Sequence, residues 1–378
     1  MRKEGARVRF WIAGGGTGGH VYPGLAVAQA LLSSGRADPA ASAKAEVLYV
    51  GSTGGVEEQL VTRSGLPFAA VEAGGLHGLS AATAAKNVIK LARGVREAWQ
   101  LGRRERPDAV FATGGYASVP PAVAAWLLRA PILVYLPDIE PGLAVRFIAR
   151  LARRVAVTTA ESGAYFAKRK VVVTGYPIRP ELAVWDKASA KDELGLAPDE
   201  LTLLVLGGSR GAKSINQALG GVLEQVLSLM QVIHVSGELD WPQVAARRDA
   251  LPAGLQARYH ASGYLHEEMG AALAAADLAV CRSGASVLGE LALFGLPALL
   301  VPYPHAWRYQ RTNAEWLASR GAAQIVPDQQ LADRLLPTVR ELVEDRSQLA
   351  AMAERSRRLA RPDAAKRLAE ELVALAAA

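Results

Sequence analysis

The chain has 378 residues, 51% of them apolar and 21% charged, a balance typical of a soluble α/β protein with roughly two to three domains. Its 43 lysines and arginines exceed its 36 acidic residues and leave a formal charge of +7, which suits nucleic acid, an anionic membrane surface or phosphorylated ligands as partners. The single cysteine, Cys281, excludes an intramolecular disulfide framework and indicates a reducing compartment.

Short apolar runs that alternate with Ala/Leu-rich helical stretches predict buried parallel strands in a doubly wound sheet. In the first half of the chain these runs are VRFWIAG (8–14), EVLYVGS (46–52), PDAVFATGG (107–115), APILVYLPD (130–138), RVAVTTA (154–160) and KVVVTGYP (170–177). A helix is expected from about Pro23, directly after the first strand and its glycines.

A charged stretch with three prolines, residues 174–200, is interpreted as a linker and its surroundings. The strands expected after it are LTLLVLGG (201–208), QVIHVSG (231–237), LAVCRSG (278–284) and GLPALLVPYP (295–304). We therefore predict an α/β fold with two Rossmann-like, doubly wound domains facing a cleft, one over residues 1–177 and one over residues 178–378. The amphipathic helix predicted within residues 362–378 is expected either to cap the second domain or to cross back to the first.

Glycine clusters follow four of the predicted strands, in GGGTGGH, TGGYAS, GGSRGAKS and RSGASV. A glycine turn that leads into a helix presents backbone N–H groups and the positive end of the helix dipole to an anion. The first cluster fits G-x-G-x-x-G at Gly14, Gly16 and Gly19. A nicotinamide site is disfavoured, because the second strand ends in Gly-Ser-Thr instead of an acidic residue, and no P-loop motif occurs. Two glycine turns in each domain predict a cleft for two phosphorylated ligands, without a cofactor.

Six segments resemble the MurG family of N-acetylglucosaminyltransferases: GGGTGGHVYPGLAVA, GGYASVPPAVAAW, GYPIRPEL, GGSRGAKSINQAL, CRSGASVLGELALFGLPALLVPYPHAWRYQRTNA and RGAA. The resemblance implies a GT-B fold that binds UDP-N-acetylglucosamine mainly in the C-terminal domain and an undecaprenyl-linked acceptor in the N-terminal domain. It implies inverting, metal-independent transfer to lipid I, undecaprenyl-pyrophosphoryl-N-acetylmuramyl-pentapeptide, which makes lipid II for peptidoglycan synthesis. The sequence has no D-x-D pair for a divalent ion.

The resemblance assigns donor contacts position by position. The matching residues are Thr17, Gly18, Gly19, Arg179, Ser209, His266, Ala285, Ser286, Val287, Leu288, Gly289, Glu290, Gln310 and Asn313. Backbone N–H groups at the helix start after Ala285 suit the diphosphate, and Glu290 can accept protons from both ribose hydroxyls. His266 is expected to act through its backbone, and Gln310 and Asn313 are expected to face the sugar.

On the acceptor side, the second glycine loop matches the family at Gly114, Gly115, Tyr116 and Ser118. Together with the first loop, these residues are expected to surround the acceptor diphosphate and the point of transfer. Inverting transfer needs a base for the acceptor hydroxyl, and His20 is the first candidate, with a role in orienting the loop as its alternative. Asp138 is the rival base.

The sequence departs from the family at residues 135–138, where Tyr-Leu-Pro-Asp replaces a His-Glu-Gln-Asn run, and at His77, where a basic residue is common. Asp138 therefore has a carboxylate, which only accepts hydrogen bonds, where the family has an amide that both donates and accepts. Both changes lie on the acceptor side. The donor is therefore the firmer prediction, and the alternative function is a related GT-B transferase with another lipid or natural-product acceptor. A non-catalytic UDP-sugar-binding protein is a third hypothesis.

The acceptor implies a membrane. Residues 76–104 combine apolar positions with six lysines and arginines, which fits either a helix on the anionic inner membrane surface or an ordinary helix packed on the sheet. Arg129 and several prolines interrupt the most apolar stretch, residues 119–137, so no spanning helix is expected. No nucleic-acid partner is expected, since aromatic residues are only 6% and no binding motif occurs. We predict a peripheral enzyme on the cytoplasmic face of the cell membrane.

Overall fold

The computed structural model describes residues 7–37, 44–75, 81–208, 211–306 and 308–378. The chain divides into two compact units, one of residues 1–179 with residues 362–378 and one of residues 180–361. This division lies two residues beyond the expected boundary at residue 177, and the last helix belongs to the first unit.

Among its described residues, the first unit forms a parallel sheet of seven strands in the order β3-β2-β1-β4-β5-β6-β7. The strands are β1 (Val8–Gly14), β2 (Ala45–Ser52), β3 (Phe68–Val71), β4 (Ala109–Gly114), β5 (Ile132–Leu136), β6 (Arg154–Val157) and β7 (Val171–Val173). The strand order reverses between β1 and β4, and ligands of such sheets bind outside the carboxyl ends of the strands at this switch point. Both strands lead into a glycine cluster there.

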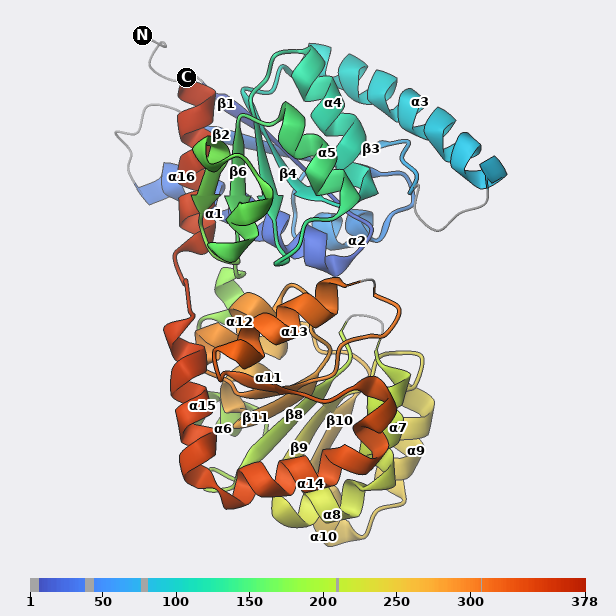
Figure 1. Cartoon of the computed structure of the whole chain (residues 1–378), viewed down its shortest axis with the longest axis vertical. Helices are drawn as coiled ribbons and strands as arrows, with labels where there is room; N and C mark the ends of the chain where they lie inside the picture. Colours follow the sequence, from blue (N-terminus) through green and yellow to red (C-terminus); the bar gives the residue numbers. More distant parts are fainter. Residues whose placement is uncertain (1–6, 38–43, 76–80, 209–210, 307) are drawn as a thin grey trace. The chain divides into compact units, whose positions relative to one another are not determined.

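Helices cover both faces of this sheet (Figure 1). They are α1 (Gly18–Ala37), α2 (Val56–Arg63), α3 (Ala81–Glu105), α4 (Val119–Leu127), α5 (Leu143–Leu151) and α16 (Ala364–Ala377), with 3-10 turns η1 (Tyr116–Ser118), η2 (Glu161–Tyr165) and η3 (Lys168–Lys170). Side chains of β1 alternate between the faces, as strand geometry requires. Phe10 and Ile12 share an apolar cluster with Leu372 of α16, whereas Trp11 packs with Ala98 of α3 on the other face. The last helix therefore completes the core of the first unit, beside α1.

The described residues of the second unit form a parallel sheet of six strands in the order β10-β9-β8-β11-β12-β13. The strands are β8 (Thr202–Leu206), β9 (Gln231–Val235), β10 (Tyr259–Ser262), β11 (Leu278–Cys281), β12 (Ala298–Leu300) and β13 (Ala323–Ile325). The switch point lies between β8 and β11, the two strands that lead into the glycine clusters of this unit. Both units therefore place their glycine clusters where doubly wound sheets bind ligands.

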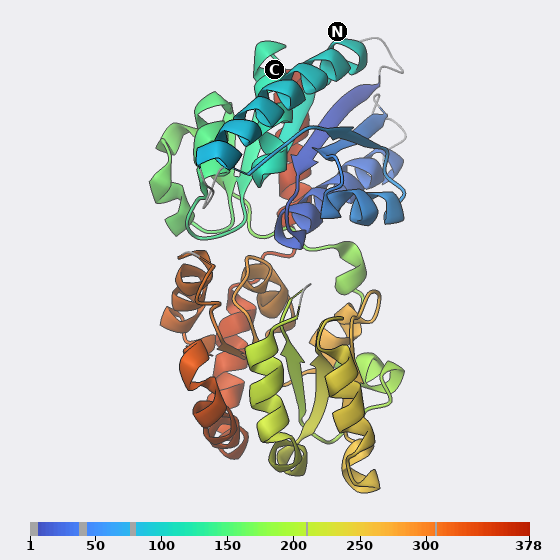
Figure 2. The same ribbon diagram turned by 90° about the vertical axis from the view of Figure 1, so that its right-hand side faces the viewer.

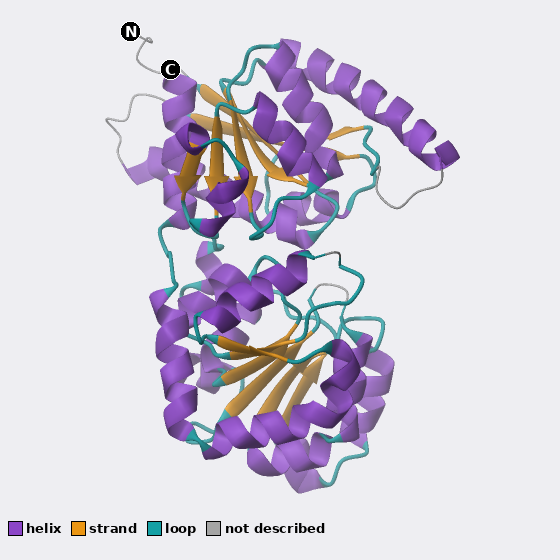
Figure 3. Cartoon of the chain, viewed as in Figure 1, coloured by secondary structure: helices purple, strands orange, loops and turns teal. Residues whose placement is uncertain are grey.

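Helices also flank the second sheet (Figure 3). They are α6 (Lys187–Glu193), α7 (Lys213–Gly221), α8 (Leu223–Leu229), α9 (Trp241–Asp249), α10 (Ala253–Gln256), α11 (Met269–Ala275), α12 (Val287–Phe294), α13 (Tyr309–Ser319), α14 (Leu331–Glu344) and α15 (Arg346–Arg358), with 3-10 turns η4 (Pro180–Leu182) and η5 (Asp328–Gln330). α7 and α9 lie side by side (Figure 2).

The predicted α/β class with two Rossmann-like sheets is confirmed. In the part of the chain that the structure describes, no helix combines the length and hydropathy needed to cross a bilayer.

Candidate active site

In the first unit, the two glycine loops pack directly against each other at the switch point. Gly115 has a φ of +74°, and a Cβ on it would lie 2.1 Å from the carbonyl oxygen of Gly15, so only glycine fits there. Tyr116 lies across the first loop, with a ring carbon 3.1 Å from where a Cβ on Gly16 would be. Tyr116 is 37% exposed, so it forms part of the surface at these loops.

His20 stands in the first turn of α1, between these loops. Its Nδ1 lies 2.9 Å from the carbonyl oxygen of Thr113, and the Thr113 hydroxyl donates to the carbonyl oxygen of His20 at 2.6 Å. A carbonyl oxygen can only accept, so Nδ1 carries a proton, and in the neutral form of the ring Nε2 holds the lone pair. The ring also packs where a Cβ on Gly114 would lie, 3.1 Å from Cε1. An imidazole fixed in this tautomer can accept a proton through Nε2, as a general base does.

Residues 135–138, where the sequence departs from the family pattern, lie partly in the buried strand β5 and partly in the turn after it. Tyr135 is fully buried, its hydroxyl donates to the carbonyl oxygen of Gly175 at 3.1 Å, and burial raises its pKa well above the usual range. Leu136 is buried in the apolar cluster that contains Trp11. Asp138 is half-buried in the turn between β5 and α5. The change to Tyr135 therefore lies in the interior of the sheet. Asp138 lies beyond the carboxyl end of β5, where ligands of such sheets bind.

The other predicted residues of the first unit differ in their surroundings. Thr17 is exposed directly before α1, and Gly18 and Gly19 are the first two residues of that helix. Ser118 is fully buried, and its hydroxyl donates to the carbonyl oxygen of Gly115 at 2.8 Å, so it supports the turn of the second loop. Arg179 ends the first unit, with its guanidinium carbon 4.3 Å from the centre of the Tyr22 ring on α1. This cation–π contact fixes the arginine near the start of α1.

In the second unit, residues 285–290 span the end of the turn after β11 and the start of α12, and α13 supports this turn. The Ser283 hydroxyl donates to the backbone carbonyl oxygen of Gln310 at 2.7 Å. Asn313 is fully buried, and its Nδ2 donates to the carbonyl oxygen of Ser283 at 3.1 Å. The Oε1 of Gln310 accepts from the backbone N–H of Tyr303 at 2.8 Å. Asn313 therefore supports the turn from below, and its predicted contact with the sugar stays a prediction.

Glu290 is half-buried in the first turn of α12, where a carboxylate also suits the helix dipole. Burial raises the pKa of the Cys281 thiol to about 12, with a contribution from the charge of Glu290, so this cysteine is not a reactive nucleophile. His266 is exposed in the segment after β10, and its backbone N–H donates to Oε2 of Glu268 at 3.3 Å. Ser209 lies outside the described residues, as does His77.

Arg282 was not predicted from the sequence, although it joins three segments to the turn. Its guanidinium donates to the carbonyl oxygen of Val301 at 3.1 Å and to the hydroxyl of Ser214 at 2.8 Å, and it forms an ion pair with Asp328. The Arg282 side chain is only 10% exposed. A charged residue directly after a buried strand, in CRSGAS, was the available signal. Arg282 fixes the base of the turn from the β11 side.

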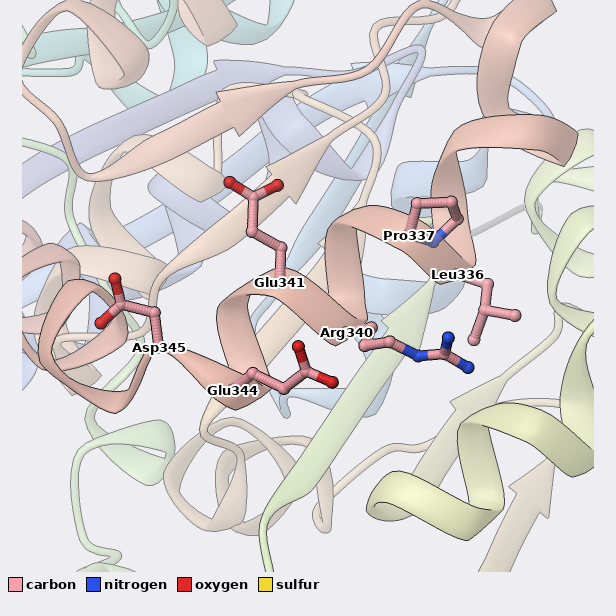
Figure 4. A pocket seen from close by; sticks show the side chains of 6 residues that line it. All are labelled: Leu336, Pro337, Arg340, Glu341, Glu344 and Asp345. Atoms are coloured by element: carbon pink, nitrogen blue, oxygen red, sulfur yellow. The ribbon is translucent and has the colours of Figure 1, made fainter.

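A pocket of about 660 Å³ lies elsewhere in the second unit, on α14 (Figure 4). Its lining residues are Leu336, Pro337, Arg340, Glu341, Glu344 and Asp345. None of them is a predicted site residue. Among the residues that the structure describes, no group of three or more His, Cys, Asp or Glu side chains is placed to hold a metal ion.

Comparisons with known proteins agree over nearly the whole chain. Residues 10–157 match the glycosyltransferase family 28 N-terminal domain, and residues 202–368 match the glycosyltransferase family 28 C-terminal domain. A UDP-N-acetylglucosamine–N-acetylmuramyl-(pentapeptide) pyrophosphoryl-undecaprenol N-acetylglucosamine transferase of Roseiflexus sp. is 45% identical, with 96% of this chain and 94% of the relative covered. The protein of the same name from Moorella thermoacetica is 40% identical, with 94% and 96% covered.

The crystal structure of Acinetobacter baumannii MurG is similar in fold, with a TM-score of 0.74, 26% identity, and 97% of this chain and 99% of that chain covered. UDP-GlcNAc 2-epimerase from Neisseria meningitidis, at 12% identity and a TM-score of 0.67, shares the fold. The chain therefore belongs to glycosyltransferase family 28 and, within it, to the MurG family, with two Rossmann-like domains of the GT-B type.

Proposed function

We propose that the chain transfers N-acetylglucosamine from UDP-N-acetylglucosamine to lipid I and so makes lipid II, the activity that the names of its relatives describe for those proteins. The observation that carries the proposal is His20, held in one tautomer between two glycine loops at the switch point. In the proposed reaction the acceptor hydroxyl attacks the anomeric carbon and the bond to UDP breaks. Nε2 of His20 takes the hydroxyl proton, and the electron pair of the broken bond leaves with the diphosphate.

The second unit supports the donor half of the proposal. Residues 285–290 include the start of α12, whose first N–H groups suit a diphosphate, and Glu290 in the first turn of this helix suits ribose hydroxyls. The side chain of Arg282 and the bond from Asn313 to Ser283 hold two adjacent residues at the start of this turn. A preorganised set of donors stabilises the leaving diphosphate without reorganisation during the reaction.

The test is to incubate the purified chain with radiolabelled UDP-N-acetylglucosamine and a short-chain lipid I analogue. The proposal predicts a labelled product that co-migrates with lipid II. A chain that binds the donor but leaves lipid I unmodified, and glycosylates a different lipid or natural product, would support the alternative acceptor instead. A chain that binds the donor and glycosylates nothing would be a UDP-sugar-binding protein.

We further propose that α3, α4 and α5 form the side that meets the anionic membrane surface, at the cytoplasmic face where lipid I is presented. One side of α3 packs on α4, while Ile89, Arg93 and Arg96 recur at helical spacing on an exposed side. The exposed large apolar side chains of the three helices are Val88, Ile89, Trp126, Leu127, Leu143 and Phe147. Apolar side chains flanked by arginines suit insertion at an anionic lipid surface.

Sedimentation with vesicles tests this surface. The chain is expected to co-sediment with phosphatidylglycerol vesicles and much less with phosphatidylcholine vesicles, and salt should weaken the binding. Ile89→Glu should reduce the bound fraction, whereas Leu239→Glu, at an exposed leucine of the second unit, should not. Equal binding of both variants would refute the assignment of this face.

A further inference from the structure

A buried carboxyl group lies directly beneath the first glycine loop. Glu57, in the first turn of α2, is 0% exposed. Its Oε1 accepts from the backbone N–H of Ser52 at 2.7 Å and from the Ser52 hydroxyl, and its Oε2 accepts from the backbone N–H of Gly16 at 3.1 Å. Backbone N–H groups can only donate, so each carboxyl oxygen serves as an acceptor. The side chain therefore joins the end of β2 to the loop that follows β1.

Three glycines make room for this carboxyl group. A Cβ on Gly15 would lie 2.4 Å from Cδ of Glu57, one on Gly51 would lie 2.7 Å from Cγ, and one on Gly55 would lie 2.3 Å from Oε1. Two of these glycines belong to the GSTGG segment at the end of β2. The glycines that replace the ribose-binding acid of a dinucleotide site thus surround a carboxylate that points inward, toward the loop.

The hydrogen bond between Glu57 and Gly16 is connected to His20 through the backbone of the first glycine loop. Thr17 follows Gly16, and its carbonyl oxygen accepts from the backbone N–H of His20 at 3.1 Å. On the other side of the loop, the Tyr49 hydroxyl donates to the carbonyl oxygen of Gly14 at 3.1 Å. The loop that orients His20 is therefore held from below at both ends. Because Glu57 occupies the N–H of Gly16, that group is not available to a ligand phosphate.

We propose that Glu57 is a positioning residue for the transfer step, which holds the first glycine loop so that Nε2 of His20 meets the acceptor hydroxyl. The expected effect on kcat rests on the proposed function, because it requires turnover of lipid I. The loop and the tautomer of His20 exist without substrate and can be measured without it.

The first experiment compares Glu57→Gln with Glu58→Gln, a matched change at the adjacent, exposed residue of the same helix. A glutamine keeps one acceptor oxygen and turns an N–H donor toward a second donor, so either the contact with Gly16 or that with Ser52 is lost. Glu57→Gln is expected to lower kcat about 10–100-fold, the effect of a small misplacement of a reacting group. The KM for UDP-N-acetylglucosamine should change much less, because most of the predicted donor contacts lie in the second unit. Glu58→Gln should match the wild type. Unchanged kcat in Glu57→Gln would overturn the proposal.

The second experiment reads His20 directly. Imidazole ¹⁵N shifts distinguish the Nδ1–H tautomer, and the signal of His20 among the six histidines is identified by its loss in His20→Gln. Glu57→Gln should broaden or shift this signal, and Glu58→Gln should leave it in place. The result holds even if the chain fails to glycosylate lipid I, so failure of the proposed function and failure of this inference are distinguishable. An unmoved His20 signal in Glu57→Gln would refute the positioning role.

If Glu57→Gln does not fold, Ser52→Ala decides the question, because it removes one of the three hydrogen bonds that orient the Glu57 carboxyl group beneath Gly16. Ser52→Ala is expected to change kcat and the His20 signal in the same direction as Glu57→Gln, to a smaller extent. A folded Ser52→Ala variant with wild-type kcat and a wild-type His20 signal would contradict the proposal.

Discussion

Acidification is expected to destabilise the second unit through His234, a histidine of β9 that is 1% exposed. The Tyr259 hydroxyl donates to its Nδ1 at 2.6 Å, and its Nε2 donates to Oδ1 of Asn216 at 2.9 Å. The Nδ2 of Asn216 donates to the carbonyl oxygen of Ser236 and to the Asp240 carboxylate, so its oxygen must be the atom that faces the histidine. The network accommodates the neutral ring, whereas protonation would place a charge in a buried site and force the Tyr259 hydroxyl from donor to acceptor.

Burial lowers the pKa of His234 from 6.5 to about 4, and the charge of Arg247 adds to the effect. In the unfolded chain the ring takes up a proton as the pH falls below 6.5, whereas the folded ring stays neutral until about pH 4. Stability that is fully present above pH 6.5 is therefore lost as the pH falls toward 4. At about 1.4 kcal/mol per pKa unit, the loss is about 3 kcal/mol.

Hydrogen exchange of peptides from β9, corrected for the pH dependence of the intrinsic rate, measures this loss between pH 7.5 and 4.5. His234→Gln should have a lower starting stability and a much flatter pH dependence. Part of the pH dependence of stability should remain in His234→Gln, because burial also lowers the pKa of His260. His266→Gln, at an exposed histidine, serves as the control and should keep the wild-type slope. Equal slopes in the wild type and His234→Gln would refute the reasoning.

Three further outcomes are expected. Glu290→Ala should weaken UDP-N-acetylglucosamine binding by about 1.5–3 kcal/mol in calorimetry, through loss of a charged acceptor, and an unchanged affinity would remove Glu290 from the donor site. Gly115→Ala should abolish transfer and leave donor affinity intact, because its Cβ would lie 2.1 Å from the carbonyl oxygen of Gly15; active enzyme would show that the loops tolerate separation. Turnover should persist in EDTA, since helix ends and Arg179 suit the leaving diphosphate, and a loss restored by magnesium would argue for a metal.

The sequence predicted those features of the fold that depend on local pattern. Apolar runs such as VRFWIAG become strands buried on both faces, as parallel sheets require. Glycine clusters follow β1 and β4 because strand-to-helix turns there need positive φ angles and close backbone approach, at Gly114 and Gly115. These are properties of neighbouring residues, so they are visible without a structure.

Features that depend on distant contacts were not predictable in the same way. The amphipathic pattern of α16 requires a partner surface but does not specify one, and Leu372 completes the core of the first unit. The hydrogen bond from Nδ2 of Asn313 to the carbonyl oxygen of Ser283 joins residues thirty positions apart, and no local pattern indicates it. Residues 57 and 58 are adjacent glutamates that the sequence does not distinguish. In the structure, Glu57 is buried beneath the glycine loop and Glu58 is exposed.

The most direct test of the account is the turnover of His20→Gln in lipid II synthesis, measured together with its affinity for UDP-N-acetylglucosamine. We expect kcat to fall about 10²–10⁴-fold, the effect of losing a general base, while donor affinity stays at the wild-type value. Near-normal turnover in His20→Gln, together with an inactive Asp138→Asn variant, would contradict the account and assign the base to Asp138.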